Sequence, residues 1–483
     1  MWAIVSRLSI LKAGGAYISI DAQYPPAYLD SVIQRSKASI MLTTSVFSAK
    51  FKHSVKNIVE VDSESVEPLR LWQPQACQAV QPDNACLVLF TSGSTGKPKG
   101  IIQEHRSYAT AICDYVRLLE MGPNSRVFQF DDYACDISNN DYMTALVAGG
   151  CCCVPTPEPT IAALKENINV LNANITFLTP TIAIQLQPED VPNLKVLCIG
   201  GESPSNDLLE KWCKHVKLVN QYGMGEAATF CAYNDNVQRD SGSVIGRPGS
   251  GAIWVVNTAS LEHLMPVGAV GEILIEGPHL ARGYLDSQCD KTDVGFLKTT
   301  PKWLADLHPQ RATARVYRSG DLGRYRHDGT VEHMGRKDTL LKLNGYRVEA
   351  VEVEYFLRTC LSTNDAAVVN LLGILDGEEE PVLTAFLYLP ECRMDVTSNV
   401  LEGISFQQVT KTHIMRPLVE RMTNTIRDHL PAHMVPSLFL LVDTIPRTKS
   451  NKTDRRRLQL YAQEWYMTNR AVISASLFGN VKA

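Results

Sequence analysis

Short apolar runs separated by helix-like patterns recur through the first three quarters of the chain. Runs at residues 40–42, 86–90, 195–199 and 271–275 have the composition and length of buried strands. Strands that alternate with helices are typical of proteins in which helices cover a sheet. The pattern therefore predicts an α/β fold with layered sheets in this part of the chain.

The pattern changes near residue 335. Beyond it we expect a helix over residues 350–361, strands near 366–372 and 382–389, a helix from 409 to 430 and a loop at 446–457. This succession of elements predicts a smaller α+β domain. Residues 459–483 give no clear assignment.

The apolar run at 86–90 leads into a segment rich in glycine, hydroxyl and lysine side chains, residues 91–100 (TSGSTGKPKG). Glycines let backbone N–H groups approach an anion, and hydroxyl and ammonium groups add donors. Thr91 and Pro98 distinguish this segment from the common nucleotide loop G-x-x-x-x-G-K-[ST]. We expect a phosphate-binding loop, with a solvated glycine turn as the plainer alternative.

The composition is that of an ordinary globular protein, with 483 residues of which 45% are hydrophobic and 20% charged. Lysine and arginine (47) nearly balance aspartate and glutamate (51), which argues against nucleic acid or an anionic membrane as the main partner. No apolar run approaches the ~20 residues that cross a bilayer. Thirteen cysteines without a secretion signal favour a reducing compartment, so we expect a cytoplasmic protein.

Further motifs accompany the phosphate loop in a fixed order along the chain. They are residues 11–17 (LKAGGAY), 91–100, 220–226 (NQYGMGE), 271–285 (GEILIEGPHLARGYL), 317–322 (YRSGDL), 335–349 (GRKDTLLKLNGYRVE), 430–436 (LPAHMVP) and 446–458 (PRTKSNKTDRRRL). In this order they resemble the adenylate-forming (AMP-binding) superfamily, most closely the adenylation domains of nonribosomal peptide synthetases. The resemblance covers nearly the whole chain, and the shared order of eight motifs makes it specific.

The resemblance implies a large N-terminal domain of layered α/β sheets over residues 1–336 and a small mobile α+β domain over 337–458, with 459–483 as a tail. Asp338 resembles the hinge about which the small domain rotates. The motif at 11–17 normally lies well inside the large domain, so we expect that domain to be truncated at its N-terminus. An isolated module without its start, a mis-assembled gene sequence and a decayed copy remain alternatives.

The reaction of the family explains why these motifs are needed. A carboxylate attacks the α-phosphate of ATP to give an acyl-adenylate and pyrophosphate, and the acyl group then passes to a thiol. The resemblance implies ATP and Mg²⁺ as cofactors, and a phosphopantetheine thiol on a separate carrier protein as acceptor. We expect a ligase of secondary-metabolite biosynthesis that activates an amino acid and has neither a nucleic-acid nor a membrane partner.

Several residue types within the motifs suit nucleotide binding. Asp321 resembles the carboxylate that accepts both ribose hydroxyls, Tyr222 the ring that stacks on adenine, and Glu226 the Mg²⁺ ligand. Taken alone, Asp321 could be a turn residue and Tyr222 a core residue. The residues expected to bind ATP are Thr91, Ser92, Gly93, Ser94, Thr95, Gly96, Lys97, Gly201, Glu202, Asn220, Tyr222, Gly223, Asp321 and Arg336.

Two lysines, Lys452 and Lys99, are expected to be catalytic. Lys452 resembles the C-terminal lysine that reaches the substrate carboxylate and the phosphate, where a mobile positive charge stabilises the transition state. Without its surrounding motif, Lys452 would be interpreted as one residue of a solvated basic loop.

An aspartate indicates the class of substrate. Asp136, in residues 135–141 (CDISNND), resembles the residue that pairs with the α-ammonium of an amino acid, and a buried cation needs such a carboxylate. Asp132 and Asp141 are alternatives for this role. Two aromatic rings and a glycine among the other pocket positions suit a medium or large, mainly apolar side chain. Those positions are Ile137, Asn140, Phe177, Cys198, Gly200, Gln221, Thr229 and Phe230.

Three residues depart from the family pattern: Gly225 replaces a threonine, Asn451 a glycine and Cys135 an aromatic residue. None of these changes removes an essential charge. An acyl- or aryl-CoA ligase is an alternative function, against which Asp136 argues. An inactive remnant is another, and the charged residues at positions 226, 321 and 452 argue against it.

Overall fold

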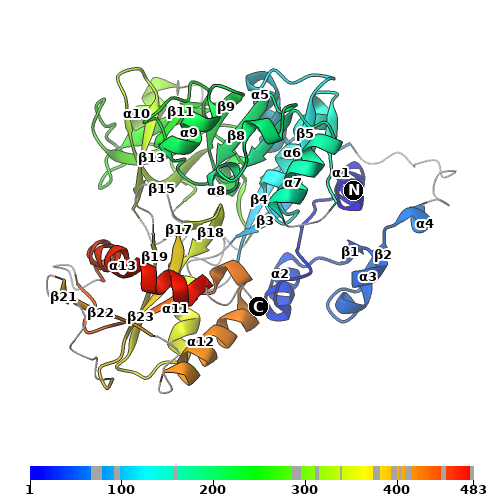
Figure 1. Cartoon of the computed structure of the whole chain (residues 1–483). Helices are drawn as coiled ribbons and strands as arrows, with labels where there is room; N and C mark the ends of the chain where they lie inside the picture. Colours follow the sequence, from blue (N-terminus) through cyan, green and yellow to red (C-terminus); the bar gives the residue numbers. More distant parts are fainter. Residues whose placement is uncertain are drawn as a thin grey trace. The chain divides into compact units, whose positions relative to one another are not determined.

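The computed structural model describes residues 1–66, 79–91, 98–156, 160–285, 295–309, 315–337, 340–373, 381–392, 400–401, 404–409, 415–447 and 453–478 (Figure 1). The chain divides into two compact units. Unit 1 comprises Met1–Ala22, Val32–Thr91 and Lys99–Asp338, and unit 2 comprises Gln23–Ser31, Ser92–Pro98 and Thr339–Ala483. The last division falls close to the domain boundary predicted after residue 336, which stays a prediction.

Among the described residues, the main sheet of unit 1 has eleven strands in the order β12–β13–β15–β16–β11–β10–β9–β8–β7–β5–β6. Strands β6, β5, β7, β8 and β9 pair in parallel, and the remaining pairs are antiparallel. The bounds are β5 (Arg126–Phe128), β6 (Cys151–Cys153), β7 (Ile175–Leu178), β8 (Val196–Gly200), β9 (Lys217–Tyr222), β10 (Ala232–Asn234), β11 (Val244–Pro248), β12 (Ala252–Val256), β13 (Gly271–Glu276), β15 (Val316–Tyr325) and β16 (Val331–Arg336).

The parallel strands are covered on both faces, so their side chains alternate between two hydrophobic cores. In β8, Leu197 and Ile199 pack in the same core as Trp212 of α9, whereas Cys198 packs in the core that contains Tyr115 of α5. The helices of unit 1 are α1 (Trp2–Lys12), α3 (Ser45–Ser48), α4 (Ser63–Val66), α5 (His105–Leu118), α6 (Ile137–Val147), α7 (Ile161–Val170), α8 (Pro180–Ala183), α9 (Asn206–Trp212) and α10 (Lys302–Leu307), with the 3-10 turns η1 (Ala49–Phe51), η3 (Pro188–Asp190) and η4 (Gly225–Ala227).

Within the described residues, unit 1 has two smaller sheets. Helix α2 (Pro26–Ser36) spans residues assigned to both units. Strands β14 (Gly283–Tyr284), β4 (Lys99–Glu104) and β3 (Ala85–Thr91) form an antiparallel sheet, and β1 (Ile40–Thr43) pairs in parallel with β2 (Asn57–Glu60). The four apolar runs used above appear as β1, β3, β8 and β13, each with ends within one residue of the prediction. The predicted α/β fold class is confirmed.

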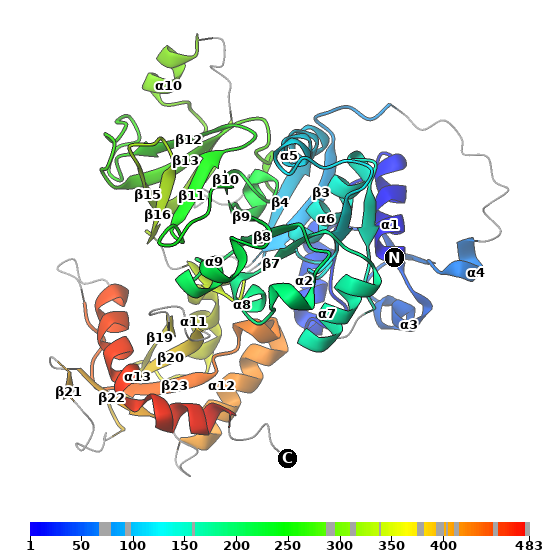
Figure 2. The ribbon, with the colours of Figure 1, turned by 45° about the horizontal axis from the view of Figure 1, so that its top comes forward.

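Unit 2 has a sheet whose two faces carry different helices (Figure 2). Val369 packs with Leu357 of α11 and Ile426 of α12, whereas its neighbour Val368 packs with Trp465 of α13. The strand order is β19–β20–β23–β22–β21, and β17 and β18 form a separate hairpin. The bounds are β17 (Leu340–Leu343), β18 (Tyr346–Glu349), α11 (Ala350–Thr359), β19 (Ala366–Leu372), β20 (Val382–Tyr388), β21 (Val400–Leu401), β22 (Ile404–Gln408), α12 (Arg416–His429), η6 (Ala432–Met434), β23 (Leu438–Val442) and α13 (Arg455–Phe478).

Two predictions for unit 2 were wrong. The helix predicted from 409 to 430 is wrong at its start: Val409 directly follows β22 and its amide donates to the Phe439 carbonyl (3.0 Å), whereas α12 begins at Arg416. Arg455 to Arg457, predicted to lie in a loop, form the first turn of α13. Asp454 accepts a hydrogen bond from the Arg457 amide (3.0 Å), as helix N-caps do. The unassigned residues from 459 onward continue this helix to Phe478.

In the part of the chain that the structure describes, no helix combines the length and apolar character needed to cross a bilayer. The cysteines within this part are free thiols.

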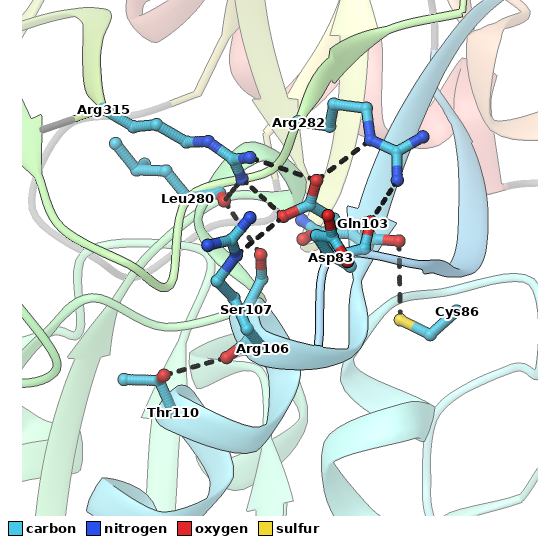
Figure 3. Close-up of polar contacts among 10 residues, drawn as sticks. Asp83, Cys86, Gln103, Arg106, Ser107, Thr110, Leu280, Arg282 and Arg315 are labelled. Atoms are coloured by element: carbon cyan, nitrogen blue, oxygen red, sulfur yellow. Dashed lines mark hydrogen bonds and ion pairs between the residues drawn. The ribbon is translucent and has the colours of Figure 1, made fainter. Parts of the chain in front are cut away.

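Glu104, at the end of β4, is the centre of a polar network within unit 1. Its carboxylate is 2% exposed and accepts hydrogen bonds from Arg315 (2.8 and 3.0 Å), Arg282 (2.9 Å) and Arg106 (3.0 Å). Figure 3 labels these three arginines, whose guanidinium groups converge on one carboxylate. Burial alone would raise the pKa of Glu104, but the hydrogen bonds from Arg315, Arg282 and Arg106 outweigh it and lower the pKa to about 2. The network joins β4 to the segments that enter β14 and β15.

We expect Glu104→Ala to lower the free energy of unfolding by about 3 kcal/mol. This is the lower limit of the range for breaking a buried ion pair, because the three arginines keep partial contact with water. Denaturant unfolding of the full chain measures this loss. Glu210→Ala is the control, because it removes an exposed ion pair with Arg239 (3.0 Å) and should cost less than about 1 kcal/mol. Equal losses in the two variants would contradict a structural role for the network.

Candidate functional site

Asp321, the carboxylate predicted to accept the ribose hydroxyls, lies in β15, in the antiparallel part of the sheet. It is 1% exposed. Tyr222 Oη donates to its Oδ2 (2.5 Å), Arg336 Nη1 lies 2.7 Å from its Oδ1, and His333 Nε2 lies 3.3 Å from the same oxygen. The Asp321 amide donates to Ser319 Oγ (3.0 Å), so the backbone is fixed as well as the side chain.

Strand pairing explains how these residues meet. Asp321 and Arg336 lie opposite each other in the antiparallel ladder between the consecutive strands β15 and β16. The ladder shifts register between Asp321 and Gly323, and Gly320 has a φ of +75°, a conformation that glycine adopts without strain. The carboxylate therefore sits at an irregular point of the strand, next to its ladder partner.

The Tyr222 hydroxyl acts as a donor toward Asp321. Burial, and then the charge of Asp321, raise the pKa of Tyr222 well above its usual range, so the phenol keeps its proton. Its ring faces the His333 imidazole at a centroid distance of 6.1 Å. The stacking of adenine on Tyr222 stays a prediction.

Glu226, the predicted metal ligand, lies in η4 and is fully buried. Its Oε1 accepts a hydrogen bond from Tyr284 Oη (2.8 Å), which also lies 3.1 Å from Tyr317 Oη. The ammonium of Lys99 lies 5.4 Å from the centroid of the Tyr284 ring. One tyrosine thus contacts both the predicted metal ligand and a predicted catalytic lysine.

The segment from Tyr222 to Phe230 turns back on itself within a few residues. A Cβ atom on Gly223 would lie 1.9 Å from the Thr229 carbonyl oxygen, so only glycine fits there. Ala228 and Thr229 have positive φ angles of 49° and 82°, which are uncommon for residues with side chains. Such strained backbone persists only when its surroundings hold it in place, and it concentrates at functional sites.

Asp136, at the N-cap of α6, lies beside this segment. A Cβ atom on Gly225 would lie 3.9 Å from Asp136 Oδ2. Asp136 is half-buried. Its pKa is raised to about 6, mainly by burial; a hydrogen bond from the Cys135 thiol (3.6 Å) acts in the opposite direction, and the charge of Glu226 acts in the same direction as burial. Within the described residues, no positively charged side chain pairs with Asp136.

The two alternative aspartates have different surroundings. Asp132 is exposed and accepts a hydrogen bond from the Ala134 amide (2.7 Å). Asp141 is buried, and burial, followed by the charge of Asp131, raises its pKa well above the usual range. Of the three predicted candidates, Asp136 is therefore the one whose carboxylate adjoins Gly225.

Most of the predicted side-chain pocket positions come together on one face of the parallel strands. The rings of Phe177 and Phe230 are 5.3 Å apart, and both pack in the core that contains Cys198, with Ile137 against it. A Cβ atom on Gly200 would lie 3.3 Å from the Phe177 ring and 2.5 Å from a backbone oxygen of β9, so only glycine fits between the ring and the neighbouring strand.

Gln221 gives this cluster its polar group. Its Nε2 donates to Tyr115 Oη (2.8 Å), and its buried Oε1 has no hydrogen-bond partner among the described residues. Thr229 Oγ1 lies 3.5 Å from the Asp136 carbonyl oxygen. Asn140 is buried one helical turn after Asp136, and no side-chain contact defines its role.

The remaining predicted nucleotide-binding residues are placed unevenly. Thr91 ends β3, and its buried hydroxyl has no partner among the described residues. Gly201 has a φ of +82°, and Glu202 accepts a hydrogen bond from Thr181 Oγ1 (2.7 Å). The Asn220 amide donates within the sheet, to the carbonyl oxygen of residue 244 (3.2 Å). Outside the described residues lie Ser92, Gly93, Ser94, Thr95, Gly96, Lys97, Asp338 and Lys452.

Sequence reasoning did not assign roles to four residues of these clusters: Ser319, Tyr284, His333 and Tyr115. Ser319 and Tyr284 lie inside quoted motifs, so motif position could have indicated them. His333 comes two residues before the motif at 335–349, and Tyr115 lies on a helix without any local signal. Only the strand register and helix packing bring these last two to the site.

Comparisons with known proteins show the family to which the chain belongs. The family described as AMP-binding enzyme matches residues 1–285, more than half of the chain. Nonribosomal peptide synthetase resC of Aspergillus sclerotiorum is 37% identical over 476 residues, which cover 96% of this chain and 36% of that protein. Peramine synthetase ppzA of Metarhizium rileyi is 32% identical over 486 residues, which cover the whole chain and 16% of that protein. The chain thus spans about a third or less of these relatives.

Solved structures show the same fold. Holo-PA1221, a nonribosomal peptide synthetase protein containing adenylation and PCP domains, has a TM-score of 0.72 at 23% identity, covering 94% of this chain and 73% of that chain. The Vibrio cholerae adenylation domain AlmE, in complex with glycyl-adenosine-5'-phosphate, has a TM-score of 0.71 at 20% identity, covering 96% and 87%. The fold, the ordered motifs and the family match lead to one conclusion: the chain belongs to the AMP-binding enzymes, the family of adenylate-forming ligases.

Proposed function

We propose that this chain activates an amino acid as an aminoacyl-adenylate, releases pyrophosphate, and passes the aminoacyl group to a phosphopantetheine thiol of a carrier protein. One observation carries the proposal: the segment from Tyr222 to Phe230 contacts Asp321 at its start and adjoins Asp136 at Gly225. A single strained segment therefore connects the carboxylate suited to ribose with the carboxylate suited to a substrate amine.

ATP and Mg²⁺ fit the residues present. The unpartnered Thr91 hydroxyl stands where the phosphate loop begins, and Glu226 offers a hard carboxylate oxygen. The described residues contain no group of three or more side chains that could hold a metal ion, so Mg²⁺ would take most of its ligands from phosphates and water. Bound there, Mg²⁺ would neutralise charge on the phosphates.

The chain's own residues then position the reactants. Asp321, held by Tyr222 and Arg336, would accept the ribose hydroxyls and fix the nucleotide. A carboxylate oxygen of the amino acid attacks the α-phosphorus, and the bond from that phosphorus to the bridging oxygen of pyrophosphate breaks. Lys99 and Lys452 would stabilise the charge that develops during this transfer, whose rate depends mainly on positioning and charge neutralisation.

The unpaired state of Asp136 supports an amino acid over other acids. Without a cation the carboxylate is costly to ionise, and a substrate ammonium would remove that cost. The aromatic cluster suits an apolar side chain, and the unpartnered Gln221 Oε1 suits one hydrogen-bond donor on it. The amino-acid adenylate bound by AlmE and the adenylation–PCP composition of PA1221 support the substrate and the carrier.

ATP–pyrophosphate exchange tests the proposal directly. With Mg²⁺ present, we expect exchange to depend on an amino acid and to be weak with the same acid lacking its α-amine, because the amine pairs with Asp136. Phenylalanine with 3-phenylpropionate and tyrosine with 3-(4-hydroxyphenyl)propionate are matched pairs for the panel. Exchange driven only by hydroxybenzoates or fatty acids, or no exchange by protein with a folded circular dichroism spectrum, would contradict the proposal.

Removing the charge of Asp136 should affect the amino acid and spare ATP. We expect Asp136→Ala and Asp136→Asn to lower kcat/KM for the amino acid by about two to four powers of ten, since an unpaired buried charge costs roughly 3–5 kcal/mol. The KM for ATP should hardly change. Asp132→Ala, at an exposed carboxylate, is the matched control and should retain activity. Loss in Asp132→Ala or Asp141→Ala with an active Asp136→Ala variant would assign the amine to another aspartate.

The lysine of the C-terminal motif should act on turnover. We expect Lys452→Ala to slow adenylate formation by orders of magnitude and to leave ATP affinity nearly unchanged, because its charge is used in the transition state. Lys449→Ala, in the same basic segment, is the control and should have a small effect. If Lys452→Ala weakened only ATP affinity, the residue would belong to binding and not to catalysis.

A further inference from the structure

Arg7 of α1 is a buried arginine whose hydrogen-bond acceptors within the described residues are neutral groups, and whose charge also acts on the Asp132 carboxylate. It is 3% exposed. It donates to Ser19 Oγ (2.8 and 3.1 Å), to Ser138 Oγ (3.2 Å) and to the Tyr133 carbonyl oxygen. Its guanidinium carbon lies 5.1 Å from the centroid of the Tyr133 ring, and 5.4 and 5.6 Å from those of Tyr17 and Tyr142.

Two of these acceptors flank Asp136 along the chain. Tyr133 precedes it by three residues and Ser138 follows it by two. Ser138 Oγ in turn donates to the Cys135 carbonyl oxygen (2.8 Å), which closes the turn around Asp136. Arg7 therefore holds both ends of the turn that presents this carboxylate.

A second contact from the same part of the chain acts on the same helix. Tyr17 Oη donates to Asn139 Oδ1 (2.7 Å) and lies 3.1 Å from Tyr142 Oη. The ring of Tyr17 also faces the Arg7 guanidinium. The start of α6 is thus fixed by a network that originates in residues 7 to 19.

The cost of burying the Arg7 guanidinium indicates that this side chain does more than fill space. Removing a guanidinium from water is costly, and an apolar side chain of similar volume would fill the space at a lower desolvation cost. Three aromatic rings offset part of that cost through cation–π attraction. What the guanidinium adds is a set of fixed donors, which an apolar side chain cannot supply.

We infer that Arg7 is a positioning residue for the substrate amine. It fixes the turn from residue 133 to 138 so that the Asp136 carboxylate stays beside Gly225, where the amino acid is proposed to bind. The inference rests on the proposed function, and it adds α1 to the elements that determine amino-acid affinity.

The test compares Michaelis constants in ATP–pyrophosphate exchange, with the amino acid that the unmodified protein uses best. We expect Arg7→Ala to raise the KM for the amino acid at least tenfold and to leave the KM for ATP within twofold. Arg7→Lys keeps the charge but loses the fork of donors, so it should give a smaller rise of the same kind. Ser138→Ala removes one acceptor and the link to Cys135, and should act in the same direction.

Arg126→Ala is the matched control. Arg126 also donates from a partly buried position to backbone oxygens, those of Leu171 (2.6 Å) and Asn172 (3.1 Å), but within the described residues it makes no hydrogen bond to residues 133–138. Its loss should lower the melting temperature without separating the two Michaelis constants.

The results of this experiment distinguish a failure of the Arg7 proposal from a failure of the proposed amino-acid activation. If the unmodified protein exchanges with an amino acid but Arg7→Lys and Ser138→Ala leave its KM unchanged, the inference is overturned and the function stands. Equal rises in both Michaelis constants would also overturn it, because they indicate general loss of structure. If the unmodified folded protein uses no amino acid, the proposed function fails first and the inference fails with it. Should Arg7→Ala not fold, the two milder variants decide.

Discussion

A carboxylate withdrawn from water must be paired, accept hydrogen bonds or take up a proton, and the site depends on how three carboxylates meet this constraint. Asp321 is surrounded by Tyr222, Arg336 and His333. Glu226 accepts a hydrogen bond from a tyrosine. Asp136 has no cationic partner among the described residues, and its pKa is raised to about 6. These surroundings support the proposal that Asp321 binds the ribose hydroxyls and that Asp136 binds a cation.

The same constraint explains why the backbone between these carboxylates is strained. Bringing Tyr222 to Asp321 and Gly225 to Asp136 requires a chain reversal within a few residues, which only a glycine at 223 and positive φ angles at Ala228 and Thr229 allow. Gln103 of β4, which donates to the Gly225 carbonyl oxygen, and Asp136 at the N-cap of α6 are among the surroundings that hold it. The strained backbone of residues 222–230 is consistent with the proposal that this segment contacts both the nucleotide and the amino acid.

Much of this fold could be predicted from the sequence because apolar periodicity is local. The strands at 366–372 and 382–388 follow directly from it, as do the buried strands of unit 1. Periodicity failed at Val409, which follows β22 and bonds to Phe439 where a helix start was predicted, and at α13, where Asp454 caps a helix within a basic run. Tyr115 could not be assigned because it packs against residues far away in the sequence, and His333 could not because its place depends on the register shift in the β15–β16 ladder.

Asp136 is proposed to pair with a substrate ammonium, and this pairing can be measured as proton release on binding. At pH 6 about half of a carboxyl with a pKa of about 6 is protonated, so pairing with an ammonium should release about half a proton per amino acid bound. Titration calorimetry in buffers of different ionisation enthalpy measures this number. We expect no proton release above pH 8, where Asp136 is already ionised, and no proton release from the Asp136→Asn variant at pH 6. No release at pH 6, or an equal release in Asp136→Asn, would contradict it.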